Sequence, residues 1–129
     1  MNRWNIPDWL EREIIERDRQ CVYCGVEFNG QGANRRERPS WEHIINDARI
    51  VTPRNIARCC IGCNASKGKR DLVEWFGSEY CANRRITPHS VALVVRSALH
   101  SRQVSDAQNP SSVYASVDGV KRGPDPSLE

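Results

Sequence analysis

The chain has 129 residues, a hydrophobic fraction of 39%, and 19 Lys plus Arg against 16 Asp plus Glu, which gives a formal charge of +3. This length predicts one domain with a modest core, and small cores often need a covalent or metal staple. The slight basic excess does not by itself identify a nucleic-acid binder. The longest apolar run, residues 91–95, is far short of the roughly 20 residues of a membrane span. Early charges in the N-terminal segment exclude a signal peptide, so we expect a cytoplasmic protein outside the membrane.

In chain order, residues 7–19 predict a helix with Leu10 and Ile14 on its apolar stripe. Residues 29–40 predict a loop, because they are rich in Gly, Asn and Arg. Two short strands are expected at 41–45 and 49–52, a second helix from about residue 64, and a third after Thr87. From residue 105 the composition changes to Ser, Asp, Gly and Pro. We therefore predict one domain over 1–104 and a disordered tail over 105–129.

Two Cys-x-x-Cys turns, Cys21 with Cys24 and Cys60 with Cys63, have the spacing of metal knuckles. Two such turns complete a tetrahedral four-thiolate site, which zinc prefers and which leaves no position for a reactive water. We therefore predict a structural zinc ion. Two redox motifs are the alternative, but the strand-helix alternation of a redox fold is missing from the sequence. Cys59 could replace Cys60 as ligand; we favour Cys60 because its spacing repeats the first knuckle.

Between the knuckles, the apolar segment 40–46 contains a charged pair, Glu42 and His43. Asn64 follows the last cysteine, so the second knuckle ties it to the zinc. If the strand crosses the second helix, Glu42, His43 and Asn64 meet. A carboxylate and an amide oxygen suit Mg²⁺ or Mn²⁺, and a neutral imidazole beside that ion could take a proton from water attacking phosphorus.

Simpler roles exist for each of these residues. An isolated Glu-His pair is usually a surface pair or a satisfied buried couple. Asn64 could cap the second helix, and Asn55 could be an ordinary turn residue. Ideal strand alternation sends Glu42 and His43 to opposite faces, so one shared site requires the strand to end, twist or bulge there.

The order of these residues in "CVYCG", "WEHIIN" and "RNIARCCIGCNASKG" resembles the HNH endonuclease family. The resemblance covers about residues 19–76. It implies an α+β fold with a zinc-stapled ββα-metal (treble-clef) core, to which the remaining helices are flanking extensions. It also implies that the chain is a metal-dependent enzyme that hydrolyses DNA phosphodiester bonds.

The resemblance assigns His43 as the general base and Glu42 as a ligand of the catalytic metal. Asn55 takes the place of the middle Asn, which braces the loop and fixes the base. Asn64 stands where many members have His, so the chain would be an HNN variant with Asn64 as the second metal ligand. Lys67 would lie near the backbone of bound DNA.

Further basic residues are candidates for phosphate contacts. Beside the presumed site these are Lys67, Lys69 and Arg70; in the loop and near the second knuckle they are Arg35, Arg36, Arg38, Arg54 and Arg58. A solvated loop is the equal alternative for the arginines. The small size leaves a homodimer or a larger assembly open. The rival interpretations are a non-cleaving zinc-stabilised DNA-binding module and a zinc protein that docks on other proteins.

Overall fold

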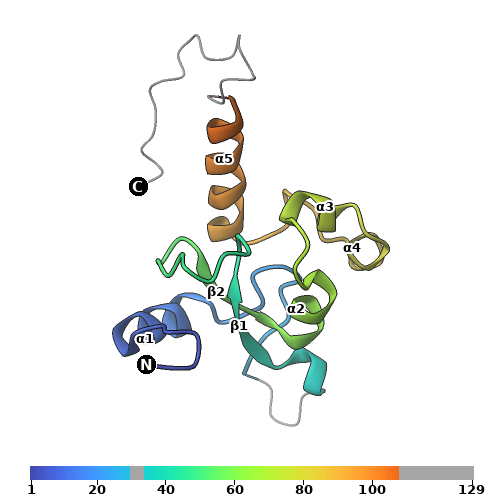
Figure 1. Ribbon diagram of the computed structural model, residues 1–129. Coiled ribbons are helices and arrows are strands. Elements are labelled where there is room, and N and C mark those ends of the chain that lie inside the picture. The colour runs from blue at the N-terminus through green and yellow to red at the C-terminus, as the bar shows by residue number, and fades with distance from the viewer. Residues whose placement is uncertain (30–33, 108–129) are drawn as a thin grey trace.

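A central β-hairpin carries a helix on each side. The computed structural model describes residues 1–29 and 34–107. Their elements, in order, are α1 (Asp8–Arg17), the 3-10 turn η1 (Arg35–Glu37), β1 (Pro39–His43), β2 (Ile56–Cys60), α2 (Ile61–Lys67), α3 (Leu72–Phe76), α4 (Glu79–Arg84) and α5 (Leu93–Ala107). Figure 1 shows α1 and α2 on opposite sides of the hairpin, with α5 extending away from it.

The strands β1 and β2 are antiparallel, with Pro39 opposite Cys60 and His43 opposite Ile56. The chain passes from β2 into α2 without a loop, and the sulfur of Cys60 caps the helix by accepting from the amide of Cys63. A four-cysteine cluster joins the hairpin and this helix to the first knuckle. The result is a small α+β fold with a treble-clef-like core, and it confirms the predicted fold class.

The hairpin separates two hydrophobic clusters. On the α1 side, Ile6, Leu10, Ile14 and Ile56 are fully buried, and Trp41 packs against them. The larger cluster contains Trp75, which is fully buried. Burying one large apolar side chain stabilises a fold by about 1.5–3 kcal/mol. Apolar packing therefore fixes the hairpin on both of its sides.

An ion pair between neighbouring residues fastens α1 to β2. The guanidinium of Arg17 lies 2.7 Å from Oδ1 of Asp18 and donates to the carbonyls of Pro53 and Ile56. The other carboxylate oxygen of Asp18 accepts from the amide of Arg58 at 3.1 Å. Asp18 is buried, so all of its contacts serve to hold this corner together.

Several element boundaries differ from the sequence predictions. Residues 49–52 form no strand, and the second strand lies at Ile56–Cys60 instead. The predicted second helix is two helices, because Gly68 ends α2 with φ of 52° and Asp71 starts α3 by capping two amides. The helix α4 was not expected from the sequence.

The C-terminal helix also differs from its prediction. α5 begins at Leu93, after a turn in which Ser90 donates to backbone carbonyls and accepts the Thr87 amide. The first three residues of the predicted tail, 105–107, are the end of α5, and the rest of that tail lies outside the described residues. In the described part of the chain, no helix has both the length and the apolar character needed to cross a bilayer.

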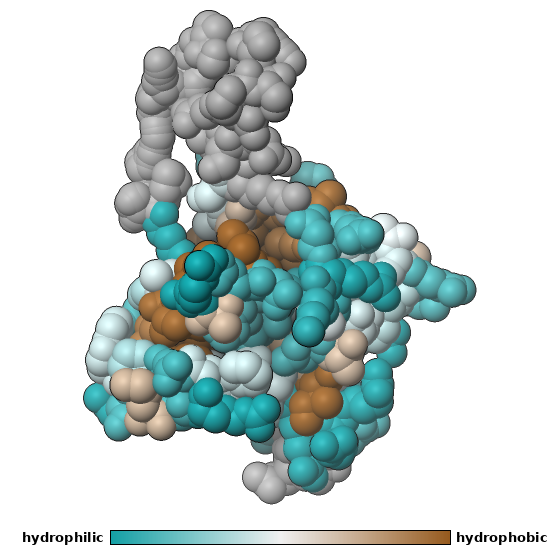
Figure 2. All heavy atoms as spheres, viewed as in Figure 1, coloured by the Kyte–Doolittle hydropathy of each residue, from teal (hydrophilic) through white to brown (hydrophobic). Residues whose placement is uncertain are grey.

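On the face shown in Figure 2, hydrophobic residues gather near the base of α5, and most of the remaining surface is hydrophilic. A cavity of about 400 Å³ beside this helix is lined by Ile44, Ile45, Leu72 and Leu99, with Lys69 and Asp71 at its polar side. Ile44 and Ile45 directly follow His43, so this hollow borders the segment that the sequence analysis singled out.

Candidate functional site

The four predicted zinc ligands meet in one place. The sulfurs of Cys21, Cys24, Cys60 and Cys63 all lie within 4.8 Å of one another. The sulfurs of Cys24 and Cys60 are 3.8 Å apart. Zinc–sulfur bonds of about 2.3 Å in a tetrahedron require sulfurs about 3.8 Å apart, so the cluster fits this ion. Among the described residues, this is the one group of three or more His, Cys, Asp or Glu side chains placed to hold a metal.

Backbone amides of each knuckle point at its first sulfur. Cys21 accepts from the amides of Tyr23 and Cys24 at 3.3 and 3.4 Å, and Cys60 accepts from the amide of Cys63 at 3.4 Å. Gly25 completes the first turn with φ of 82°, a conformation that glycine adopts without strain. Amides directed at sulfur favour the thiolate over the thiol, which is the form that binds a metal.

The pKa values of the four clustered thiols differ because the neighbouring sulfurs compete for protons. The pKa of Cys21 is lowered to about 7, first by its hydrogen bond with Cys24. The pKa values of Cys24 and Cys63 are raised, first by their hydrogen bonds with Cys21, because four neighbouring thiols cannot all ionise. A divalent ion removes this conflict by balancing the negative charges, so the donor set fits a structural zinc ion.

The two remaining cysteines, Cys59 and Cys81, lie outside the cluster. Cys59 is fully buried, and burial raises the pKa of its thiol. Cys81 is fully buried as well, and burial again raises its pKa. Cys60 is therefore the knuckle cysteine and Cys59 a core residue. Tyr80, which the sequence analysis did not mention, donates its hydroxyl to the sulfur of Cys63 at 3.4 Å.

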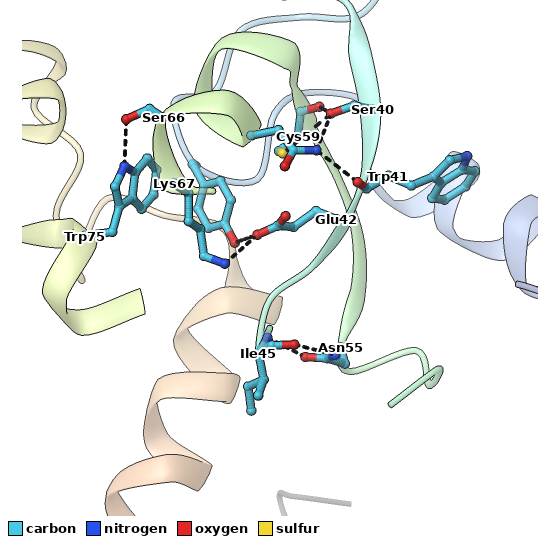
Figure 3. Close-up of polar contacts among 11 residues, drawn as sticks. Ser40, Trp41, Glu42, Ile45, Asn55, Cys59, Ser66, Lys67 and Trp75 are labelled. Carbon is cyan, nitrogen blue, oxygen red and sulfur yellow. Dashed lines mark hydrogen bonds and ion pairs between the residues drawn. The ribbon is translucent and has the colours of Figure 1, made fainter. Parts of the chain in front are cut away.

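Glu42 points towards α2 and is neutralised there. Its Oε2 lies 2.9 Å from Nζ of Lys67 and accepts the hydroxyl of Tyr23 at 2.6 Å. Figure 3 shows the Glu42 side chain directed at Lys67, while Trp41 leaves the other face of β1. The side chain of Lys67 is 1% exposed and that of Glu42 is 6% exposed. The structure thus differs from the prediction for Lys67, whose ammonium is buried against a carboxylate rather than presented to a phosphate.

Asn64 is tied to the strand instead of to Glu42. It is the fourth residue of α2, so it does not cap the helix. Its Nδ2 donates to Oγ of Ser40 at 2.9 Å and to the carbonyl of Trp41 at 3.0 Å. In this arrangement Glu42 is paired with Lys67, and the Nδ2 of Asn64 is bonded to β1.

His43 lies on the opposite side of the strand from Glu42. Its ring meets the ring of Trp4 edge-on, with 5.9 Å between the centroids. Among the described residues, its Nε2 is the one buried side-chain nitrogen or oxygen without a hydrogen-bond partner. Burial lowers the pKa of His43, while Glu42 raises it by a smaller amount. His43 ends β1, yet the strand keeps its alternation, so Glu42 and His43 face different elements.

Asn55 fastens the segment that follows His43. Its Oδ1 accepts the amide of Ile45 at 2.7 Å, and its Nδ2 donates to the carbonyls of Ile45 and Ile50, each at 3.1 Å. Figure 3 shows this pair of contacts between Asn55 and Ile45. Asn55 itself is buried, and its three hydrogen bonds are partly buried. Asn55 thus makes three side-chain hydrogen bonds to the backbone of this segment, more than an ordinary turn residue makes.

The predicted phosphate-contacting residues fall into two groups. The side chains of Arg35, Arg36, Arg38, Arg54, Lys69 and Arg70 are exposed. Arg58 is half-buried, with its guanidinium 5.0 Å above the centre of the Phe28 ring, and burial lowers its pKa. Arg58, by contrast, packs beside the first knuckle through its contact with Phe28.

Sequence reasoning missed the partners of the Glu42-His43 pair, Tyr23 and Trp4. Tyr23 lies inside the first knuckle, and its position there is a signal that it packs near the second one. The sequence holds no comparable signal for Trp4, which lies far from His43 along the chain.

Comparison with known proteins adds no family: no family model, no curated protein and no solved structure matches this chain. The resemblance to HNH endonucleases rests on the motif residues alone.

Proposed function

We propose that this chain is a zinc-stapled endonuclease that hydrolyses DNA phosphodiester bonds, with His43 as its general base. The observation that carries the proposal is the state of His43. Its Nε2 makes no hydrogen bond within the described residues, and burial lowers the pKa of the ring. A neutral imidazole at pH 7 with an unused nitrogen is the form that a general base needs.

The surroundings of His43 support this role. Asn55 binds both backbone groups of Ile45, so the chain directly after His43 is fixed at two points. β2 pairs with His43 from the other side. A base held by its neighbours is already oriented before the substrate arrives, which lowers the entropic part of the barrier.

A divalent ion such as Mg²⁺ or Mn²⁺, when bound, supplies a Lewis acid that stabilises the charge on the phosphate. Glu42 and Asn64 are the residues proposed to hold it. In the structure Glu42 is paired with Lys67, so Glu42 must exchange this partner for the ion before it can hold it. What the chain contributes is the neutral His43, the bracing by Asn55 and the cationic surface.

The proposed contacts to the DNA phosphates are exposed lysine and arginine side chains. Arg35, Arg36 and Arg38 follow one another near η1, and Lys69 and Arg70 follow α2. Lys69 also lines the cavity beside Ile44 and Ile45, next to the segment after His43. Phosphate contacts of this kind give affinity without sequence preference, and the affinity falls as salt rises.

The test is cleavage of supercoiled plasmid by purified, zinc-loaded protein with Mg²⁺, with Mn²⁺ and with a chelator that leaves zinc in place. We expect nicking by wild type and none by His43→Ala. His89→Ala is the matched control, since His89 is exposed and remote from the motif. Equal nicking by wild type and His43→Ala would refute the role of His43.

One observation favours a second function, a DNA-binding module that does not cleave. Lys67 neutralises Glu42, and Trp4 lies against His43, so both motif residues are covered in the DNA-free protein. A module of this kind would bind DNA in a salt-dependent way and would leave plasmid intact with every metal. Nicking that needs His43 excludes it.

A further inference from the structure

The strongest unassigned feature is a buried triad formed by Glu42, Lys67 and Tyr23. The ammonium of Lys67 is 2.9 Å from Oε2 of Glu42, and the Tyr23 hydroxyl donates to the same oxygen at 2.6 Å. Lysine is almost never fully buried unless it is paired, and here its side chain is 1% exposed. Each charge of the pair therefore requires the other.

Contacts of α2 and of the first knuckle hold the triad in place. Asn64 and Lys67 lie three residues apart on α2, so they share a helix face, and Asn64 fastens that face to β1. Tyr23 lies between the ligands Cys21 and Cys24, and its ring meets Trp75 edge-on at 4.9 Å between centroids. These contacts thus place Lys67 beside Glu42.

We propose that Lys67 is a built-in counter-ion that keeps divalent cations away from Glu42 in the DNA-free protein. A divalent ion bound at about 2.0–2.6 Å from a carboxylate oxygen would lie within a few ångström of the Lys67 ammonium. Two cations at that separation repel each other strongly in a site that water does not screen. The ion can bind Glu42 only after the Lys67 ammonium has moved away. That movement leaves the buried Glu42 carboxylate without its partner before the ion arrives.

This inference rests on the proposed function in one respect, since Glu42 is the residue proposed there to hold the catalytic ion. It changes the expected resting state: the protein without DNA carries zinc at its cysteines and an ammonium, not a divalent ion, at Glu42. It also assigns Lys67 as a positioning residue that acts through Glu42, rather than as a contact to the DNA backbone.

The wild-type protein provides the first test. Mn²⁺ is titrated into zinc-loaded, isotope-labelled full chain, and the ring signals of Tyr23 and Trp75 are followed by NMR. Paramagnetic broadening reports an ion near Glu42 without any need for activity. We expect both sets of signals to stay sharp at millimolar Mn²⁺. Strong broadening of Tyr23 at micromolar Mn²⁺ would overturn the proposal, and this measurement does not depend on a variant that folds.

Two variants sharpen the result. Lys67→Met removes the ammonium and keeps a similar volume, so Mn²⁺ should bind near Tyr23 at least about a hundredfold tighter, because deleting a unit charge a few ångström from a divalent ion removes more repulsion than that ratio requires. The double variant Lys67→Met with Glu42→Gln should lose that gain. Zinc content and far-UV circular dichroism show that each variant is folded. A folded Lys67→Met protein with unchanged Mn²⁺ binding would refute the role of Lys67.

The outcomes for this inference and for the proposed function are separable. If Mn²⁺ occupies Glu42 in wild type and plasmid is nicked, the counter-ion proposal fails and the endonuclease stands. If Mn²⁺ is excluded from wild type and gained by Lys67→Met, but no variant or wild type nicks DNA, the counter-ion proposal stands and the endonuclease fails.

Discussion

The indole of Trp4 lies edge-on against the imidazole of His43, with 5.9 Å between the ring centroids and an angle of 71° between the rings. Trp4 belongs to an N-terminal segment fastened by Asn2, whose Oδ1 accepts the amides of Trp4 and Ile6. Asn5 turns this segment with φ of 61°. Residues close to the start of the chain thus set the environment of a side chain in the central hairpin.

Removing this indole should raise the pKa of His43. Burial is the main cause of the lowered value, so Trp4→Ala exposes the ring and moves its pKa up towards about 6.5. An NMR titration of the His43 ring protons measures this. Trp9→Ala, at an exposed position on α1, is the control and should leave the midpoint unchanged.

The same lowered pKa sets the direction of a pH effect on folding. The unfolded chain takes up a proton on His43 near pH 6.5, whereas the folded chain does so only at lower pH. Unfolding therefore takes up protons, and the free energy of unfolding should fall as the pH drops below about 6.5. Urea unfolding between pH 5 and 7 tests this, and His43→Gln should reduce the slope of stability against pH.

Adjacent cysteines should respond oppositely to the same substitution. Cys60→Ala removes one of four clustered sulfurs and should abolish stoichiometric zinc binding, because a structural site needs all four ligands. Cys59→Ala should keep one zinc per chain and lose about 1 kcal/mol of stability, because it deletes one small buried group. Metal analysis and thermal unfolding of both variants decide this. If Cys59→Ala lost zinc and Cys60→Ala kept it, Cys59 would be the zinc ligand and Cys60 the core residue.

Zinc removal should unfold the hairpin and not only the knuckles. The amide of Val22 donates to the carbonyl of Arg58, so the first knuckle is bonded to β2 directly. Binding of structural zinc contributes about 10–16 kcal/mol in small zinc domains at neutral pH, more than the stability of most small folds. A strong zinc chelator should therefore remove the near-UV circular dichroism of the buried Trp75, and added zinc should restore it.

Asn55 should tolerate no close substitute. Asn55→Asp keeps an acceptor for the Ile45 amide but cannot donate to the carbonyls of Ile45 and Ile50. The lost donor should cost about 3 kcal/mol, because the carbonyls of Ile45 and Ile50 would lose their partner and face a carboxylate. Denaturant unfolding measures this, with Asn46→Asp at an exposed neighbouring position as the control. A difference below about 1 kcal/mol between the two variants would contradict the bracing role.

Salt dependence should identify which cations meet DNA. Each phosphate contact contributes about 0.9 to the slope of log affinity against log salt, so Lys69→Ala with Arg70→Ala should reduce that slope by about 2. Arg12→Ala on α1, also exposed, should leave it unchanged. Fluorescence anisotropy with a labelled duplex at several salt concentrations gives these slopes. An unchanged slope in the double variant would remove both residues from the interface.

Knuckle spacing was sufficient to predict the metal cluster, because two residues between cysteines fix the local turn almost independently of the rest of the fold. The predicted strand at 49–52 failed for a different reason. Its apolar pattern is real, but the side chain of Asn55 binds the Ile50 carbonyl, so a neighbouring strand is not needed. The pairing of Glu42 with Lys67 depends on how α2 lies against β1, and neither residue's neighbours in sequence specify that.

The metal ligands come from two separate stretches of chain, residues 21–24 and 60–63, with the hairpin connection 44–55 between them. Arg49 in this connection has a side chain that is 89% exposed, so trypsin can reach it. A chain nicked there would keep two thiolates on each fragment. The zinc ion, together with the β1–β2 ladder, should hold both fragments together, and a chelator should weaken their association. The four-cysteine cluster is thus a link between two stretches of chain that does not require the connection 44–55 to be intact.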